Sequence, residues 1–317
     1  MDSSHFGLTH RPVPATPDTS CYYPATSHER ALARLMEGLA EGEGFLLLTG
    51  EPGTGKTLLC HCLLDRLDAG ACASLLTQGH FRDRAALLEA ILYDLSLPHE
   101  GRGEQEMRLA LTDHLLAGFA QGKATILIID EAHLLGPEQL EELRLLGNLE
   151  ARAGKALQVV LVAQPSIRET LKRPKQASLR QRLAVRIELE PLGVQEAADY
   201  LLHHVRRAGG RPGEVLAEEA LELLARGTGG VPRLLNQSAR QAMALVQEAG
   251  ATFIDVEAAM EALAVLGLEG PAAAEEVVAP AVMDTGSDSG PILCDTEPDV
   301  AAEDDPSCRI FVAPRPA

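Results

Sequence analysis

The chain has 317 residues, of which 46% are hydrophobic but only 3% aromatic, so its core must be built mainly from aliphatic side chains. Its longest apolar runs, such as residues 45–48 and 126–129, are far shorter than the ~20 residues that a membrane-spanning helix needs, and the N-terminus lacks the pattern of a signal peptide. The net charge is −18, of which −9 (11 acidic and 2 basic residues) falls in residues 269–317. Residues 1–268 therefore also carry a net negative charge, which disfavours non-specific binding to nucleic acid. Without a predicted membrane span or signal peptide, we expect a cytoplasmic protein.

The first 25 residues are rich in Pro, Thr and Ser, so we expect them to be extended. A helix is predicted to begin at Thr26, because Thr26 and Glu29 have the spacing of a capping box and apolar residues follow at helical spacing. From residue 45 onward, strands alternate with helices. The predicted strands are 45–49, 71–76, 126–130, 158–163 and 185–189, and the predicted helices between them are 56–67, 84–95, 104–120 and 138–151. This rhythm of apolar strands and helices predicts a parallel sheet covered on both faces.

After Pro191 no further strand is predicted. Helices are expected at 194–207, 215–226, 232–248 and 255–266, which together form a small all-helical domain. Beyond residue 268 the sequence is rich in Ala, Pro and acidic residues without periodicity, so we expect a disordered tail. The predicted division is an N-terminal segment with the first helix at 1–43, a nucleotide-binding core at 44–192, a helical lid at 193–268 and an acidic tail at 269–317.

The most specific motif is GEPGTGKT at residues 50–57, which matches the phosphate-binding P-loop (Walker A) between a strand and a helix. Glycines in such a loop let successive backbone N–H groups point at an anion at a helix N-terminus. The pattern predicts that Lys56 reaches the β- and γ-phosphates of ATP and that the Thr57 hydroxyl binds Mg²⁺. The residues predicted to contact the nucleotide here are Gly50, Glu51, Pro52, Gly53, Thr54, Gly55, Lys56, Thr57 and Leu58.

A second motif follows the apolar strand 126–129, which ends in Asp130 and Glu131 (Walker B). We expect Asp130 to hold Mg²⁺ through water and Glu131 to polarise the attacking water. With Ala132 and His133 these residues also spell the DEAH of a helicase class. The roughly 75 helical residues after the core are too few for the second RecA-like domain that those helicases need, and the sequence assigns no role to His133.

Three further polar residues are placed to complete a nucleotide site. Gln164 follows the strand QVVLVA and is predicted to hydrogen-bond the γ-phosphate or the attacking water. Arg182 precedes the last strand at the edge of the domain, where it can reach the nucleotide of a neighbouring subunit as an arginine finger, with Arg180 and Arg186 as alternatives. Arg233 opens a lid helix after Gly-Gly-Val-Pro and is predicted to point back at the γ-phosphate.

These motifs together resemble the AAA+ superfamily. The stretches GFLLLTGEPGTGKT, VLVAQP, LRQRLAVRIELEPL and GGVPRLLNQSARQAM are similar to the ExeA/GspA (general secretion pathway protein A) ATPases. That resemblance implies a cytoplasmic ATPase that helps to assemble an envelope secretion machine. It also implies nucleotide-site roles for Lys56, Thr57, Asp130, Glu131, Gln164, Arg182 and Arg233. Family members that work in secretion continue into a membrane span and a peptidoglycan-binding domain, whereas this sequence has the acidic segment there.

We therefore predict a three-layer αβα AAA+ core of strand order 5-1-4-3-2 with a helical lid, binding ATP and Mg²⁺ at their junction. The protein is expected to form a homo-oligomeric ring and to remodel or recruit a protein partner, at the inner membrane if the secretion role applies. The alternative is a DNA-associated ATPase similar to the TniB/TnsC regulators of transposition. The apolar segment 308–316 at the end of the tail is either a docking peptide for a partner or an uninvolved end.

Overall fold

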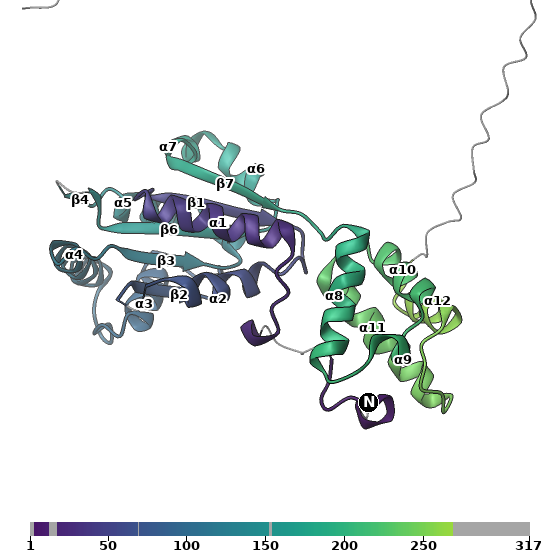
Figure 1. Cartoon of the computed structure of the whole chain (residues 1–317). Coiled ribbons are helices and arrows are strands. Elements are labelled where there is room, and N and C mark those ends of the chain that lie inside the picture. The colour runs from purple at the N-terminus through teal and green to yellow at the C-terminus, as the bar shows by residue number, and fades with distance from the viewer. Residues whose placement is uncertain (1–2, 13–17, 69, 152–153, 269–317) are drawn as a thin grey trace, which may run out of the picture. The chain divides into compact units, whose positions relative to one another are not determined.

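Five parallel strands form the central sheet in this computed structural model, which describes residues 3–12, 18–68, 70–151 and 154–268. The strands are β1 (Phe45–Gly50), β2 (Cys72–Leu76), β3 (Thr125–Ile129), β6 (Leu157–Ala163) and β7 (Leu183–Leu189). Their order across the sheet is β2-β3-β6-β1-β7 (Figure 1). Counted in chain order, this is the predicted 5-1-4-3-2 arrangement, which is confirmed.

The burial of each strand follows from its place in the sheet. Every residue of the inner strands β1, β3 and β6 is buried, which explains their nearly continuous apolar sequences. The edge strand β7 instead alternates, with Arg186 and Glu188 less buried than the apolar residues beside them. Because all neighbouring strands pair in parallel, the carboxyl ends of β1, β3 and β6 lie at one edge of the sheet.

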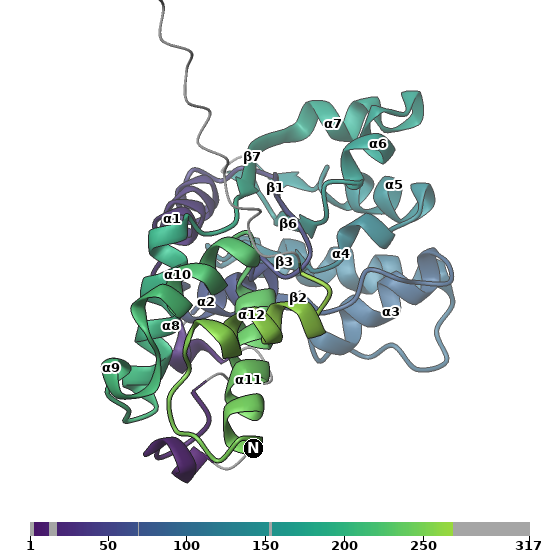
Figure 2. The same cartoon turned by 90° about the vertical axis from the view of Figure 1, so that its right-hand side faces the viewer.

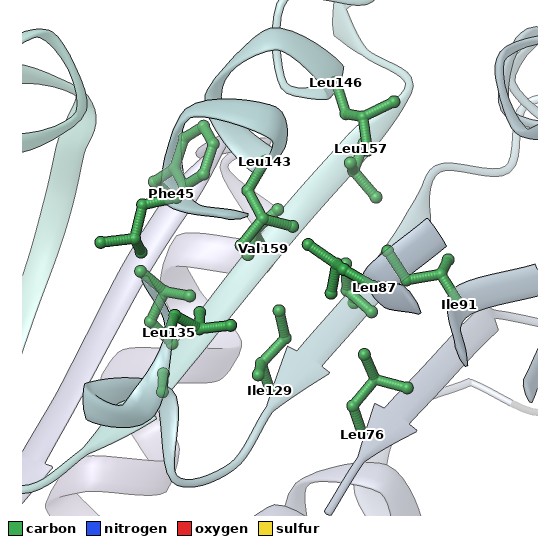
Figure 3. Close-up of a cluster of buried hydrophobic side chains, with 14 of the residues drawn as sticks. Phe45, Leu76, Leu87, Ile91, Ile129, Leu135, Leu143, Leu146, Leu157 and Val159 are labelled. Atoms are coloured by element: carbon green, nitrogen blue, oxygen red, sulfur yellow. The ribbon is translucent and has the colours of Figure 1, made fainter. Parts of the chain in front are cut away.

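Helices cover both faces of the sheet. Helices α1 (Thr26–Ala40) and α2 (Lys56–Arg66) pack on one face, while α3 (Arg84–Asp94), α4 (Glu104–Ala120) and α5 (Pro137–Leu146) pack on the other (Figure 2). Figure 3 shows the second of these two cores, in which Leu87 of α3 and Leu143 of α5 meet Ile129 and Val159 of the sheet. The core is almost entirely aliphatic, as the composition requires.

The lid is a bundle of helices with a hydrophobic core of its own. It contains α8 (Val194–Arg207), α9 (Pro212–Val215), α10 (Glu218–Gly227), α11 (Pro232–Glu248) and α12 (Val256–Val265). Phe6, Leu8 and Ala25 of the N-terminal segment are buried in this lid core. The backbone N–H of Thr9 donates to the carbonyl of Ala208 at the end of α8 (2.8 Å). The N-terminal segment therefore packs on the lid.

The structure corrects the prediction for the N-terminal segment. It contains the short helices η1 (Ser3–Phe6) and η2 (Thr19–Cys21) rather than extended chain alone. Helix α1 does begin at Thr26, but Ala25 is its N-cap and no capping box forms. Glu29 instead pairs with Arg66 of α2 (2.7 Å), and the Thr26 N–H donates to Glu196 of α8 (2.8 Å). Tertiary partners thus replace the local cap.

Two predicted helices end or begin elsewhere. Helix α5 ends at Leu146 rather than at residue 151. Gly147 is its C-cap and lies against the ring of Phe45, and the short strands β4 (Glu150–Ala151) and β5 (Gly154–Lys155) follow. The predicted helix at 215–226 begins only at Glu218, because Leu216 is extended and forms a bridge with Ile254. The structure also contains two short helices that were not predicted, α6 (Ile167–Lys172) and α7 (Ala177–Arg182), joined by η4 (Pro174–Gln176).

The predicted tail at 269–317, with its candidate docking segment, lies outside the described residues. Within the described residues, no helix combines the length and the apolar character that crossing a membrane requires.

Candidate functional site

The P-loop connects β1 to α2 in the conformation that its glycines permit. Gly53 and Gly55 have φ values of +87° and +98°, which residues with a side chain rarely adopt. Gly55 is the N-cap of α2, so the free N–H groups at the start of this helix face the loop. The arrangement is an anion-binding loop at a helix N-terminus.

Lys56, the first residue of α2, is buried beneath this loop. Its ammonium group donates to the carbonyl oxygens of Gly50 (2.8 Å) and Glu51 (2.9 Å). Burial lowers the pKa of Lys56, while the carboxylates of Glu131 and Asp130 oppose that shift. Thr54 is also buried, and its hydroxyl donates to Glu51 (2.9 Å). The lysine is therefore held inside the loop, close to both acidic residues.

Thr57 and Asp130 are brought together from two motifs that lie 73 residues apart. The Thr57 hydroxyl donates to Asp130 Oδ2 at 2.6 Å, and the other carboxylate oxygen of Asp130 accepts the N–H of Glu131 at 2.8 Å. The Asp130 N–H donates to Leu76 of β2 (2.8 Å), which fixes the end of β3. A buried carboxylate beside a hydroxyl is an oxygen donor set of the kind that Mg²⁺ prefers, so the residues present fit this ion.

Glu131 has an unusual backbone conformation. Its φ is +52°, one of two positive values among the non-glycine residues of the described chain. Gly79, in the loop after β2, lies against it: a Cβ atom on Gly79 would be only 2.1 Å from the Glu131 carbonyl oxygen. The Glu131 side chain is 39% exposed, so its carboxylate stays accessible at the end of the sheet.

His133 connects Glu131 to Gln164. The ring is in η3 (Ala132–Leu134), with Nε2 at 3.4 Å from the Glu131 carboxylate. Its Nδ1 accepts the backbone N–H of Gln164, the residue that follows β6, at 3.3 Å. The ends of the neighbouring strands β3 and β6 therefore meet through this imidazole.

These residues surround a cavity of about 280 Å³ at the carboxyl edge of the sheet. The P-loop contributes Pro52, Gly53, Gly55, Lys56, Thr57 and Leu58 to its lining, and Glu131, Gln164 and Arg233 also face it. Of the other predicted residues, Gly50 and Glu51 supply the carbonyls that hold Lys56, while Thr54 and Asp130 are buried behind the lining.

Arg233 is placed against the loop by the first turn of α11. Its backbone N–H donates to the Gly53 carbonyl (3.2 Å), and a Cβ on Gly53 would be 2.7 Å from the Cβ of Arg233. Gly53 thus serves both the turn of the loop and the close approach of the lid. Along α11, Asn236 and Arg240 line the same cavity at helical spacing.

Sequence reasoning missed the part of the cavity formed by the N-terminal segment. Tyr22 and Tyr23 line it, with Tyr22 packing against the sheet core and Tyr23 against Tyr200 in the lid (5.8 Å between ring centres). His28 of α1 is buried, and its Nε2 is 2.9 Å from the Thr54 carbonyl. With only 3% aromatic residues in the chain, two adjacent tyrosines before the first helix were a signal that could have been used.

Two known sequences or families resemble this chain. A family model described as an AAA domain matches residues 39–171. General secretion pathway protein A of Aeromonas hydrophila is 39% identical over 238 residues, which cover 74% of this chain and 43% of the relative. These two matches support an AAA+ ATPase of the General secretion pathway protein A type. The chain spans less than half of the length of that relative.

Solved structures of AAA+ ATPases share the fold. Cdc6p from Pyrobaculum aerophilum has a TM-score of 0.64 at 20% identity, over 83% of this chain and 70% of that one. ORC2 from Aeropyrum pernix, solved as ADPNP-ADP complexes, has a TM-score of 0.57 at 19% identity, over 74% and 66% of the two chains. A mutant form of Thermotoga maritima RuvB has a TM-score of 0.54 at 20% identity, over 80% and 74%. At these identities the likeness to solved structures shows the fold of the chain.

The candidate arginine fingers of this AAA+ domain lie away from its own cavity. Arg182, the last residue of α7, donates to the side chain of Asn148 and to the Arg144 carbonyl (3.4 Å), both beyond the lining. Arg186 donates to the Arg180 carbonyl (2.6 Å). The exposed Arg180 guanidinium makes no hydrogen bond or ion pair within the described part of the chain. The role of an arginine finger stays a prediction for all three.

Proposed function

We propose that this protein is a Mg²⁺-dependent ATPase whose hydrolysis cycle changes the contact between core and lid and so remodels or recruits a protein partner. The observation that carries the proposal is the Thr57–Asp130 hydrogen bond of 2.6 Å, because it joins the P-loop to the acidic strand end beside Lys56 and Glu131. The roles of the individual residues rest on this convergence and on the family.

Each group in the cavity has a chemical task in that proposal. Lys56 and the N–H groups of the loop bind the phosphates of ATP, and Thr57 with Asp130 would hold Mg²⁺. Bound Mg²⁺ supplies positive charge against the phosphate oxygens. Glu131 takes up a proton from the attacking water, and Gln164 orients that water or the γ-phosphate.

Arg233 would make the contact between core and lid depend on whether the bound nucleotide has a γ-phosphate. Its backbone is joined to the P-loop at Gly53, and its side chain faces the cavity. A γ-phosphate would attract this guanidinium by charge, whereas its loss would release it. The lid contact thus differs between the two nucleotide states, which is what a remodelling cycle needs.

Phosphate release by the full chain tests the enzyme. Glu131→Gln is expected to lower the turnover by about 10²–10⁴-fold, because the amide cannot accept the proton, while nucleotide affinity stays near that of the wild type. Glu89→Gln, an exposed glutamate of α3, is the matched control and should be unchanged. Equal rates for wild type and Glu131→Gln contradict the proposal. The requirement for Mg²⁺ is tested by chelation: turnover should be lost when Mg²⁺ is chelated and should return when Mg²⁺ is added back.

The proposed partner follows from the family and from the name of the relative, General secretion pathway protein A. We propose a cytoplasmic, ring-forming ATPase that acts on a component of an envelope secretion machine at the inner membrane. The alternative, a DNA-associated ATPase, predicts ATP-dependent binding to duplex DNA that weakens steeply with salt. Absence of such binding, together with capture of a secretion component, favours the first function.

A further inference from the structure

His133 places its Nε2 atom 3.4 Å from the Glu131 carboxylate, which is within ion-pair distance. It follows Asp130 and Glu131 closely in sequence, yet neither the P-loop chemistry nor the Mg²⁺ ligands use it. Its side chain is 11% exposed, so the ring is held in place rather than free in solvent. A nearly buried imidazole therefore lies between a catalytic carboxylate and the end of β6.

The hydrogen bond to Gln164 decides which ring nitrogen carries the proton. A backbone N–H can only donate, so Nδ1 of His133 must accept from Gln164 with its lone pair. In the neutral ring the proton is then on Nε2, the nitrogen that faces the Glu131 carboxylate at 3.4 Å. The ring therefore presents a donor to Glu131 for as long as Gln164 occupies its other side.

The rest of Glu131 is fixed by its backbone. Its φ of +52° and the close approach of Gly79 hold the main chain of this residue in one conformation. The carboxylate itself can rotate at the end of a flexible side chain. A donor at one fixed place removes part of that freedom and sets the direction of the proton-accepting oxygen.

We propose that His133 is a positioning residue that orients the Glu131 carboxylate and links this orientation to the end of β6 at Gln164. The inference rests on the proposed function, because it assigns Glu131 the role of base. A movement of the Gln164 peptide toward a γ-phosphate would move the imidazole, and with it the donor to Glu131. The base would then be aligned when the terminal phosphate is present.

The test compares two replacements in the full chain. His133→Phe keeps a ring of similar size but has neither nitrogen, whereas His133→Gln keeps a donor and an acceptor. The phenylalanine variant is expected to lose about 10²-fold in kcat with KM and the affinity for a non-hydrolysable ATP analogue within about twofold of wild type. His133→Gln should recover a large part of that loss. His99→Phe, between α3 and α4, is the matched control.

A second comparison separates positioning from a merely structural role. In a Glu131→Gln background, single-turnover hydrolysis should not fall further when His133→Phe is added, because the base through which His133 acts is already gone. An equal, independent loss in both backgrounds overturns the inference, and so does a kcat of His133→Phe equal to that of wild type. Thermal unfolding of each variant checks the fold, and His133→Ala replaces the phenylalanine variant if that one is unstable.

The outcomes distinguish this inference from the proposed function. If wild type hydrolyses ATP and Glu131→Gln does not, while His133→Phe is normal, only the role of His133 is wrong. If Glu131→Gln is as active as wild type, the proposed function itself fails.

Discussion

Glu131, the proposed base, has an unfavourable backbone conformation. A non-glycine residue at φ +52° is held there at a free-energy cost of about 1–3 kcal/mol, which the surrounding structure must overcome. Two neighbours do so: Gly79 fits against its carbonyl oxygen and Asp130 accepts its N–H. The strain lies where hydrolysis is proposed to occur, at the end of β3.

Gly79→Ala tests this support. The added Cβ would be 2.1 Å from the Glu131 carbonyl oxygen, a backbone atom, so Glu131 or the loop after β2 must shift. We expect kcat to fall by about 10²-fold while nucleotide binding, measured by titration with an ATP analogue, changes little. Gly213→Ala, where a Cβ meets no atom within 4 Å, is the control. Full activity of Gly79→Ala would show that Glu131 tolerates the shift.

Helix α8 carries a second group whose environment is unusual. His204 is only 3% exposed, and its ring stacks edge-on against Tyr200 at 4.4 Å between ring centres. Burial lowers the pKa of His204 to about 4, and the nearby positive charge of His203 and Arg207 acts in the same direction. The folded lid therefore prefers the neutral ring.

This preference makes the lid sensitive to acid. The unfolded chain binds a proton at His204 below about pH 6.5, whereas the folded chain binds it only near pH 4. The contribution of His204 to the free energy of unfolding is therefore fully present above pH 6.5 and is lost as the pH falls to 4. We expect His204→Phe to reduce this loss, by up to about 3 kcal/mol of unfolding free energy. Urea unfolding at pH 7.5 and 4.5 measures it. The same pH dependence in variant and wild type would assign the acid sensitivity to other groups.

The whole molecule forms its nucleotide cavity from three stretches of chain that are distant in sequence. The core supplies the P-loop and Glu131, the lid supplies Arg233, and the N-terminal segment supplies Tyr22 and Tyr23. None of the three candidate fingers, Arg180, Arg182 or Arg186, is among the residues that line this cavity in the described chain. If one of these three residues is an arginine finger, we expect it to act on the nucleotide of another subunit.

Mixing two inactive variants tests this expectation. Arg182→Ala is expected to lose about 10³-fold or more in turnover, and Glu131→Gln about 10²–10⁴-fold. In a mixed ring, a subunit with Arg182→Ala keeps its own Glu131 and can receive Arg182 from a Glu131→Gln neighbour, so random assembly restores about a quarter of the sites. Phosphate release by an equimolar mixture reports the recovery. A mixture as inactive as its components argues against Arg182, and the same experiment with Arg180→Ala or Arg186→Ala then identifies the finger.

Local patterns in the sequence determined the strands, the position of the P-loop and the choice of Asp130 and Glu131 at the end of a strand. The strands of the sheet begin and end within two residues of their predicted limits, since an apolar run between helices has few other ways to be buried. Lys56 and Thr57 could be chosen because the P-loop has a fixed spacing, and Glu131 because it follows Asp130 directly at the end of an apolar strand. These features depend on neighbours in the chain.

Only the tertiary structure decided the features that depend on distant partners. Glu29 pairs with Arg66 of α2 instead of capping α1. Helix α5 ends before Gly147, which lies against Phe45, and Tyr23 of the adjacent tyrosines contacts Tyr200 of the lid. The role proposed for His133 has the same origin, because the atom that sets its tautomer belongs to Gln164, 31 residues away. Contacts across such separations depend on how the helices and strands pack, and a periodic pattern along one element carries no information about them.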